Sequence, residues 1–434
     1  MLAAEALAQR IKSQEVFDRA CKFIPGGVNS AARAFHGLDM TPLIAERGKG
    51  ALLYDVDGRG YIDYCQSWGA LILGHAADTV QNAVLETMKK GFGFGMTTEL
   101  EVEFAAFISQ RIPFVEKVRF VSTGTEAVMT ALRMARGFTD KPYIVKFNKN
   151  YHGHYDALLV NAGSGVCSLP NASSKGIPGA MIEKTVSLPF NDINAAKEFL
   201  EANRQIAAVI VEAVAGNMGL VPAEKEFLSL LRAYTKKIGA LLIFDEVISG
   251  FRASKGGAAE WYQIEPDLIT LGKIIGGGLP AAAIGGRKEI MDVLAPLGHV
   301  FQAGTLSGNP LAMAAGLTTL KETERENFYE ELESKTASLT DALQKEVQKR
   351  DRPITIHQMG SMFTIFFGTR NIKTDKDLEN LDFDMFARLY RFLFSKGIFF
   401  PPSPYETCFV SGAHTQEQIN YTKETILEFI RSTL

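Results

Sequence analysis

The chain has 434 residues, of which 46% are hydrophobic and 22% charged, a mixture typical of globular proteins and a length that suits two or three domains. The formal net charge of −3 excludes the strongly basic surface of many nucleic-acid-binding proteins, so we expect no nucleic acid as a partner. The four cysteines lie far apart and form no CxxC pair. This spacing indicates reduced thiols in the cytoplasm rather than a disulfide framework.

The N-terminal region predicts a helix and a hairpin. Residues 1–17, MLAAEALAQRIKSQEVF, have the pattern of an amphipathic helix and lack the basic start and apolar core of a signal peptide. The uncharged stretch 274–286 is rich in glycine and shorter than the ~20 residues that a membrane-spanning helix needs. Residues 54–64 predict a hairpin with Asp57-Gly58 at its turn. We therefore expect a cytoplasmic protein with no membrane partner.

Beyond about residue 78, short apolar runs alternate with helical or loop segments. The five runs are VRFVS (118–122), YIVKF (143–147), AAVIVE (207–212), ALLIFDE (240–246) and DLITLG (267–272). Between the first two, TEAVMTALRMAR (125–136) predicts a helix. Short apolar strands that are separated by helices indicate a mostly parallel sheet with both faces covered.

The last third of the chain has a different pattern. The elements expected there are a long, charged helical region at 313–350, strands near 354–357 and 362–367, and helices at 382–395 and from about 415. We predict an α/β protein with two domains. The large domain comprises residues 71–325 and holds the mostly parallel sheet, and the smaller α+β domain is built from both termini, residues 1–70 and 326–434.

Polar residues follow the apolar strands at the point where each strand ends. Gly124 and Thr125 come after the first strand, Tyr151 after the second, and Asp245 ends the fourth. Lys273 follows the fifth strand and precedes three consecutive glycines. In open parallel sheets, ligands bind beyond the carboxyl ends of the strands. We therefore expect these residues to gather at one site.

Each of these residues also has a simpler interpretation. The segment STGTEA can be only a helix start, since Thr123 and Glu126 can form a capping box, although the same helix N-terminus offers N–H groups to a phosphate. Asp245 can be an ordinary carboxylate at a strand end, and Lys273 can extend to water. The two histidines of NYHGHYD are too few for a metal site, so we predict none. The segment GKIIGGG lacks the order of a P-loop.

Taken together, the same residues predict a site for pyridoxal 5′-phosphate (PLP). A lysine that forms a Schiff base must be partly desolvated, as Lys273 would be. A pyridine ring that accepts electrons needs a carboxylate at its nitrogen, which Asp245 can supply. The helix start at Gly124 and Thr125 can hold the phosphate, and Tyr151 can cover the ring face.

Two motifs resemble a known family. FDEVISGFR (244–252) and LGKIIGGGLP (271–280) are similar to motifs of the class III, fold-type I aminotransferases, and the resemblance covers nearly the whole chain. Within this class, further motifs resemble the aminomutases that act on glutamate 1-semialdehyde. These motifs are PGGVNSAARAF (25–35), QSWGALILGH (66–75), GMTTELE (95–101), NYHGHYD (150–156), NAGSGV (161–166), QAGTLSGNPLAM (302–313) and PPSPYETCFVSGAHT (401–415).

The resemblance implies five residues around the cofactor ring. Lys273 would bind PLP covalently, and Asp245 would pair with the ring nitrogen. Val247 would pack under the ring, and Tyr151 would stack over it. Asn217 would lie near the 3-oxygen of the ring. Lys273 and Asp245 are therefore expected to be catalytic.

The resemblance also implies the phosphate contacts and a partner. Gly124 and Thr125 would hold the phosphate at the helix start. Thr305, in QAGTLSGNP, would reach the phosphate that is bound by the other subunit. The expected assembly is therefore a homodimer in which each chain contributes to both sites.

By the same resemblance, five residues would bind the substrate. Ser30, Arg33 and Trp68 would form the pocket for its carboxylate, because a bidentate arginine suits a carboxylate. Ser164 would contact it from the segment NAGSGV. Glu406 would face the substrate amine and take part in catalysis.

The implied reaction is an internal shift of an amino group. The enzyme would start with pyridoxamine 5′-phosphate (PMP) and convert glutamate 1-semialdehyde to 5-aminolevulinate, a tetrapyrrole precursor. Residues 161–180 are rich in glycine, serine, alanine and proline, a composition that suits an active-site lid. Such a lid would retain the diaminovalerate intermediate.

Two other functions stay open at this point. The first is an ordinary class III transaminase that acts on an ω- or β-amino acid with a separate keto-acid acceptor. It would share Lys273 and Asp245 and would differ at Ser30, Arg33 and Glu406. The second is a PLP-binding protein without turnover, against which the intact set of Lys273, Asp245 and Tyr151 argues.

Overall fold

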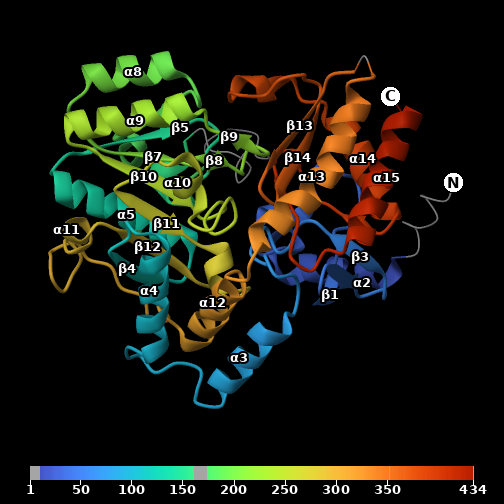
Figure 1. Cartoon of the computed structure of the whole chain (residues 1–434), viewed down its shortest axis with the longest axis horizontal. Coiled ribbons are helices and arrows are strands. Elements are labelled where there is room, and N and C mark those ends of the chain that lie inside the picture. The colour runs from blue at the N-terminus through green and yellow to red at the C-terminus, as the bar shows by residue number, and fades with distance from the viewer. Residues whose placement is uncertain (1–9, 161–173, 351, 434) are drawn as a thin grey trace.

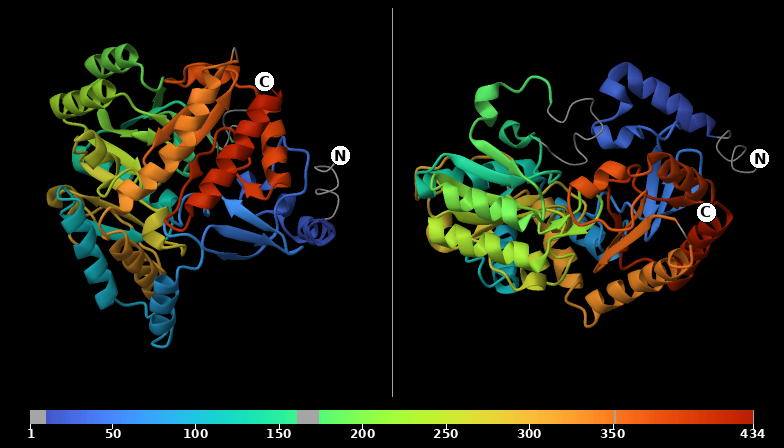
Figure 2. Two further views of the ribbon diagram at one scale, coloured as in Figure 1. Left: turned by 45° about the vertical axis from the view of Figure 1, so that its right-hand side comes forward. Right: turned by 90° about the horizontal axis from the view of Figure 1, so that it is seen from above.

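The computed structural model describes residues 10–160, 174–350 and 352–433. Two parts lie side by side: one is built around a seven-stranded sheet, and the other joins the N-terminal segment to the C-terminal third of the chain (Figure 1). Figure 2 shows from two further directions that the blue N-terminal elements lie beside the orange and red C-terminal ones. The predicted α/β class is confirmed. The division of the chain into domains at residues 71 and 325 stays a prediction.

The large sheet has the strand order β4-β12-β11-β10-β7-β5-β6. Its strands are β4 (Lys117–Val121), β5 (Tyr143–Phe147), β6 (Thr185–Leu188), β7 (Ile206–Val211), β10 (Leu241–Glu246), β11 (Leu268–Leu271) and β12 (Ala282–Gly286). All run parallel to one another except β12, which is antiparallel to both β4 and β11. The prediction of a mostly parallel sheet is confirmed, and each of the five predicted strands is present.

Two strands of this sheet, β6 and β12, were missing from the prediction. The sequence of β12 is AAIGG, and alanine and glycine are depleted in strands because they offer little side-chain packing. Nothing in this local pattern indicates a strand. β12 forms because it pairs on both sides, with β4 and with β11.

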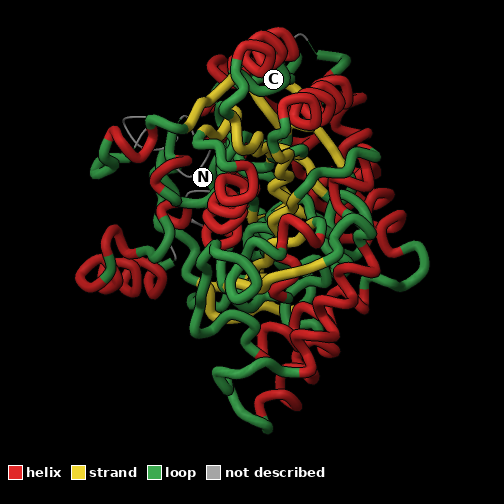
Figure 3. Tube along the Cα trace, turned by 90° about the vertical axis from the view of Figure 1, so that its left-hand side faces the viewer, coloured by secondary structure: helices red, strands yellow, loops and turns green. Residues whose placement is uncertain are grey.

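Both faces of the large sheet are buried. Neighbouring residues along a strand belong alternately to two hydrophobic clusters, as Phe120 and Val121 do on β4 and Ile243 and Phe244 do on β10. Helix α5 (Gly124–Thr139) packs on the face of Val121, and α9 (Lys225–Ile238) packs on the other face. Figure 3 shows the strands running through the interior with most helices outside them.

The remaining helices of this part connect the strands or extend from them. They are α3 (Asp78–Met88), α4 (Glu99–Arg111), α7 (Gly179–Ile182), α8 (Ile193–Ala202), α10 (Gly257–Tyr262), α11 (Lys288–Met291) and α12 (Pro310–Glu322), with the 3-10 helices η3 (Asp156–Leu158) and η4 (Lys273–Gly276). Helix α3 projects away from both sheets at the bottom of Figure 1. It packs against α12 and buries Val80, while Leu85 and Met88 toward its C-terminal end are exposed.

The second part contains two small sheets. Their strands are β1 (Ala45–Lys49), β2 (Leu52–Asp55), β3 (Gly60–Asp63) and β15 (Ile398–Phe399) in one, and β13 (Ile354–Met359), β14 (Met362–Phe367) and β16 (Cys408–Phe409) in the other. β15 pairs with β3 in parallel, with Ile398 beside Ile62. This pairing ties the C-terminal third to the N-terminal segment. The hairpin predicted around Asp57-Gly58 is β2 and β3.

Helices cover the small sheets. They are α2 (Ile11–Phe23), α13 (Phe328–Val347), α14 (Phe383–Ser395) and α15 (Gln416–Thr433), with the 3-10 helices η1 (Pro25–Gly27), η2 (Ala31–Ala34) and η5 (Lys376–Asn380). The helical region predicted at 313–350 is two helices, α12 and α13. Asn327 adopts a left-handed conformation between them, with φ 58°, which no continuous helix can contain.

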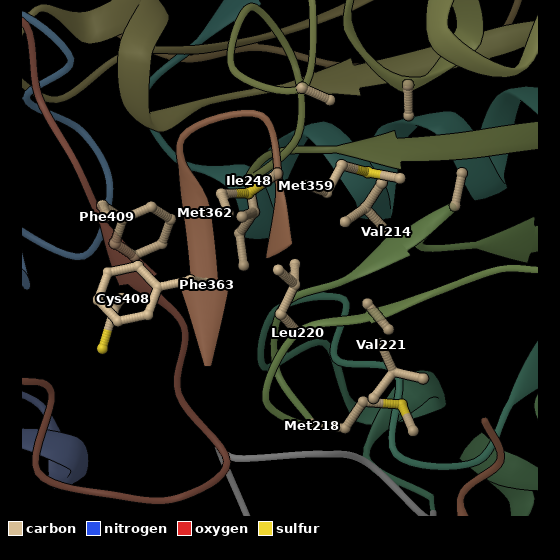
Figure 4. Packing of buried hydrophobic residues seen from close by; sticks show 14 of the residues in the cluster. Val214, Met218, Leu220, Val221, Ile248, Met359, Met362, Phe363, Cys408 and Phe409 are labelled. Carbon is tan, nitrogen blue, oxygen red and sulfur yellow. The ribbon is translucent and has the colours of Figure 1, made fainter. Parts of the chain in front are cut away.

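Apolar side chains join the two parts. A short hairpin of the first part, β8 (Val214–Ala215) and β9 (Val221–Pro222), approaches β13 and β14 of the second. Figure 4 shows Val214 and Leu220 near Met359 and Met362 in one buried cluster. Burial of apolar area is favourable by about 25 cal/mol per Å², so this cluster stabilises the arrangement of the two parts.

Candidate functional site

A cavity of about 180 Å³ lies at the carboxyl ends of the parallel strands. Its walls come from the segments that follow β4, β5, β7, β10 and β11. The lining residues are Gly124, Thr125, Val128, Tyr151, His152, Gly153, Glu212, Asn217, Asp245, Val247, Ile248 and Lys273. The structure therefore brings together every residue that we expected to contact the cofactor, apart from Thr305.

The N-terminus of helix α5 forms one wall. Thr123 Oγ1 accepts a hydrogen bond from Glu126 N (3.2 Å), and Glu126 Oε2 accepts one from Thr123 N (2.9 Å), so the predicted capping box is present. The box leaves the N–H groups of Gly124 and Thr125 without an acceptor inside the helix. Such groups bind anions, and the helix dipole adds to the attraction. This wall suits a phosphate.

Asp245 is fixed at the end of β10, with 5% of its surface exposed. Its Oδ1 accepts hydrogen bonds from Val247 N and Thr270 Oγ1, both at 3.1 Å, and its Oδ2 lies 2.8 Å from Nδ1 of the buried His152. Burial lowers the pKa of His152 despite the opposing effect of Asp245. The neutral imidazole therefore donates its Nδ1 proton to the carboxylate. These contacts hold a carboxylate at the cavity wall.

Lys273 opens η4 with φ 48°, a left-handed conformation that is uncommon for lysine. Residues held in such conformations cluster at functional sites. Burial lowers the pKa of this lysine, whereas the nearby charges of Glu406, Asp245 and Glu212 raise it. Because burial is the larger effect, the neutral amine is more accessible than in a solvent-exposed lysine. This is the state that covalent chemistry requires.

Val247 and Tyr151 supply apolar surface to the cavity. Val247 lies between Gly124 and Gly272, since a Cβ on either glycine would come within 3.1 Å of a Val247 methyl carbon. Tyr151 is half-buried, and burial raises the pKa of its hydroxyl. The tyrosine is therefore neutral, and both side chains can contact a flat ring.

Glu212 is a site residue that the sequence analysis missed. It is 3% exposed and accepts hydrogen bonds from Tyr151 N (2.7 Å), Gly216 N (3.1 Å) and Asn217 Nδ2 (2.9 Å). Burial raises the pKa of Glu212 to about 8. By holding Tyr151 and Asn217 together, it ties the segment after β5 to the segment after β7. The available signal was a lone carboxylate directly after a fully apolar strand.

The residues expected to bind the substrate are more dispersed. Glu406 lies near the first cavity, because its charge raises the pKa of both Lys273 and Tyr151. It also lines a second cavity of about 420 Å³, to which Ala31 and Ala32 contribute. Trp68 is half-buried and packs against the main hydrophobic cluster.

Four expected site residues, Trp68 among them, line neither cavity. Ser30 and Arg33 are exposed at the two sides of Ala31 and Ala32, with Arg33 N donating to Ser30 O (3.0 Å). Thr305 is exposed in the loop before α12. Ser164 lies outside the described residues, as does most of the predicted lid, 161–180. Within the described ranges, no group of three or more His, Cys, Asp or Glu side chains is placed to hold a metal ion.

Comparisons with known proteins agree with this geometry. The chain matches the family described as Aminotransferase class-III over residues 34–402. It is 50% identical over 422 residues to a protein of Protochlamydia amoebophila named glutamate-1-semialdehyde 2,1-aminomutase, with 96% of this chain and 98% of that protein covered. A protein of the same name from Aquifex aeolicus is 47% identical over 422 residues, with 97% and 100% covered.

A solved structure has the same fold. An omega-transaminase from Sphaerobacter thermophilus superposes with a TM-score of 0.88 at 32% sequence identity, over 96% of this chain and 97% of that one. Since the family match spans most of the sequence and relatives about half identical cover nearly all of it, this chain belongs to the class III aminotransferases.

Proposed function

We propose that this chain is a PLP-dependent isomerase that converts (S)-4-amino-5-oxopentanoate, glutamate 1-semialdehyde, to 5-aminolevulinate for tetrapyrrole synthesis. The observation that carries the proposal is one cavity that joins a partly desolvated lysine, Lys273, to a fixed carboxylate, Asp245. The chain in which it occurs is half identical to a protein named for this aminomutase reaction.

The cavity fits PLP, which would cycle with PMP during the reaction. Asp245 would hold a proton on the ring nitrogen, and the N-terminus of α5 at Gly124 and Thr125 would bind the phosphate. Val247 and Tyr151 would contact the two ring faces. When bound, the cofactor supplies an electron sink for cleavage of a bond to hydrogen beside the amine.

Two residues of this chain would move or orient charge during the reaction. Lys273 Nζ would hold the cofactor and carry a proton between substrate and cofactor carbons. Glu406 would face the substrate amine, and its electrostatic effect on Lys273 supports this position. Asn217 would donate to the 3-oxygen of the ring while Glu212 holds its amide in place.

The substrate carboxylate would be bound from the small-sheet side. Arg33, Ser30 and Trp68 would form this pocket, and Ser164 would contact the substrate from the lid. Ser30 and Arg33 are exposed and flank residues that line the second cavity with Glu406. We propose that closure of 161–180 over the site completes the pocket and excludes water.

The test of this function is turnover without a second substrate. Purified enzyme given only glutamate 1-semialdehyde should form many equivalents of 5-aminolevulinate per active site, because the amine that enters the cofactor comes from the same molecule. The measurement is the 5-aminolevulinate formed per mole of enzyme. Formation that stops after about one equivalent would contradict the proposal, since a transaminase needs a keto acid to complete its cycle.

A second candidate is an ordinary class III transaminase. The observation in its favour is the close superposition with an omega-transaminase. That function would use the same Lys273 and Asp245, but it would need an added keto-acid acceptor for multiple turnovers. Stimulation of product formation by a keto acid, with none in its absence, would select this candidate.

Arg33 should distinguish substrate binding from cofactor binding. We expect Arg33→Ala to raise KM for glutamate 1-semialdehyde by about 10- to 100-fold, because a hydrogen bond between charged groups contributes roughly 1.5–3 kcal/mol. Arg33→Lys should recover only part of this loss, since lysine lacks the planar fork. The PLP absorbance of both variants should equal that of the wild type. An unchanged KM in Arg33→Ala would remove this residue from the pocket.

We propose that the chain works as a homodimer. Support comes from apolar side chains that are exposed on and after α3, including Leu85, Phe92, Phe94 and Met96. Large apolar side chains that are exposed close together in the chain are typical of interaction surfaces. Thr305 would then reach the phosphate of the second subunit.

In the described part of the chain, none of the helices has the length and apolarity to span a membrane. The cytoplasmic location stays a prediction.

The apolar surface after α3 can be tested with one charge. Phe92 is 67% exposed, and we expect Phe92→Asp to shift the protein toward monomer, because a carboxylate would be desolvated in the interface. Sedimentation velocity gives the mass in solution. Phe23→Asp is the matched control, since Phe23 is 82% exposed on α2 and should leave the dimer intact. A dimeric Phe92→Asp would show that the surface lies elsewhere.

A further inference from the structure

A strained turn lies between the two parts of the molecule. Gln66, Ser67 and Trp68 are consecutive and all left-handed, with φ of 47°, 53° and 59°, and Gly69 continues the turn with φ 88°. Residues other than glycine visit this conformation singly as a rule. Three in succession persist only when the surroundings hold them, and such strain clusters at functional sites. Trp68 is part of this turn, so the backbone of the turn sets the direction of the Trp68 side chain.

On the small-sheet side, Asp63 holds the start of the turn. Its Oδ1 accepts hydrogen bonds from Cys65 N (2.7 Å) and Gln66 N (3.1 Å), and its Oδ2 lies 2.6 Å from His75 Nε2. The Gln66 side chain donates to Asp63 O (2.7 Å). Asp63 and Gln66 are both buried. These hydrogen bonds fix the first half of the turn, and the buried Gln66 Oε1 has no hydrogen-bond partner among the described residues.

On the large-sheet side, Arg252 holds the end of the turn. Its Nη2 donates to Gly69 O (2.9 Å), and its Nη1 donates to Ser361 Oγ (3.0 Å) and Val410 O (3.2 Å). The guanidinium lies 5.0 Å from the centre of the Phe409 ring. Arg252 is 1% exposed, and among the described residues it forms no ion pair with a carboxylate. The planar guanidinium group can donate hydrogen bonds to these three acceptors at once, whereas the ammonium group of a lysine cannot do so equally well.

Gly69 itself packs on the same ring. A Cβ at Gly69 would lie 2.8 Å from Phe409, so only glycine fits between the ring and the turn. Phe409 belongs to the cluster that joins the two parts (Figure 4). The turn therefore depends on contacts from 252, 361 and 409–410, all distant in sequence.

The turn also adjoins the segments that carry Lys273 and Asp245. Arg252 follows Asp245 by seven residues in the segment after β10. The side chain of Leu71, which follows the turn, approaches Gly278 in the segment after Lys273, where a Cβ would lie 2.9 Å from it. The turn is thus in contact with the segments that follow Asp245 and Lys273 in the chain.

We propose that Arg252 is a positioning residue, which holds the left-handed turn 66–69 so that Trp68 is presented to the substrate. This inference rests on the proposed function, in which Trp68 is part of the substrate pocket. It assigns Arg252 no contact with substrate or cofactor. A substitution that removes the Arg252 guanidinium group should therefore weaken substrate binding and leave cofactor binding unchanged.

The chain offers a direct probe of the turn. It has two tryptophans, Trp68 and Trp261, so Trp68 is the sole tryptophan in a Trp261→Phe background. In that background, Arg252→Lys should weaken the near-ultraviolet circular dichroism of Trp68 and increase its quenching by acrylamide. KM for glutamate 1-semialdehyde should rise about tenfold, with smaller change in kcat and with wild-type PLP absorbance and affinity.

An exposed position supplies a second test that does not disturb the core. Ser67 is exposed, and a β-branched residue resists a positive φ more strongly than serine does. Ser67→Val should therefore reproduce the changes of Arg252→Lys in the Trp68 signal and in KM. Ser67→Gly is its matched control, since glycine adopts this conformation freely, and it should keep both at the wild-type level. This pair decides the question if Arg252→Lys does not fold.

Two results would overturn the inference. A folded Arg252→Lys with unchanged Trp68 spectra would show that the arginine does not position the turn. Altered Trp68 spectra in Arg252→Lys and Ser67→Val with an unchanged KM would show that the turn does not serve substrate binding. Failure of the proposed function has a different signature. In that case the wild type forms no 5-aminolevulinate without a second substrate, whatever the state of Trp68.

Discussion

Lys273→Ala should lose turnover by about four orders of magnitude or more, because one residue supplies both the covalent link to the cofactor and the proton carrier. The methyl group can do neither. The left-handed backbone at this position, φ 48°, should persist, since the neighbouring strand and glycines hold it. PLP can still enter the cavity without a covalent bond, since the other wall residues are intact. Borohydride reduction followed by peptide mapping should find the cofactor on Lys273 in the wild type and on no lysine in the variant.

Lys146 provides a matched control for this experiment. It is fully buried, and its Nζ donates to the carbonyl groups of Asn150 (3.0 Å) and Val160 (2.8 Å). We expect Lys146→Met to lower the free energy of unfolding, because these carbonyl groups lose a charged donor. The reduced cofactor should still map to Lys273. A label on any other lysine in the wild type would refute the assignment.

Asp245→Asn should reduce kcat by about 100- to 1,000-fold while the fold and some cofactor binding remain. An adjacent negative charge raises the pKa of a ring nitrogen by roughly 1–3 units, and the amide removes that charge. The network around it can adapt. The amide oxygen can still accept from Val247 N and Thr270 Oγ1. In the variant, the imidazole of His152 can carry its proton on Nε2, which has no hydrogen-bond partner in the wild type. Its Nδ1 can then accept a hydrogen bond from the amide nitrogen of the substituted side chain in place of donating to the carboxylate.

The readouts are kcat and the absorbance of the bound cofactor, which reports the protonation of the ring. Asp267 is the control, because it is a buried carboxylate at the opposite end of the same sheet, before β11. Its Oδ2 accepts from Leu242 N (2.7 Å) and Arg232 Nη2 (2.8 Å). Asp267→Asn should lower thermal stability without altering the cofactor absorbance. Turnover of Asp245→Asn near the wild-type level would remove Asp245 from the ring nitrogen.

The position of the cavity could be predicted from the sequence for a simple physical reason. Buried parallel strands are continuous apolar runs, so β4, β5, β7, β10 and β11 can be recognised locally. Their carboxyl ends must meet at one edge of the sheet, and the polar residue after each run must lie there. Lys273 and Asp245 were therefore expected near each other although they come from different strands, and they line the same cavity.

Other features were decided only by the tertiary structure, because they depend on partners distant in the chain. The AAIGG segment becomes strand β12 only between β4 and β11. Glu212 joins the site through Tyr151, 61 residues earlier. The turn at Trp68 is held by Arg252, which reaches Gly69 across 183 residues. Local patterns report which face of an element is buried, but only the packed chain determines which acceptors surround a buried charge and which backbone strain is tolerated.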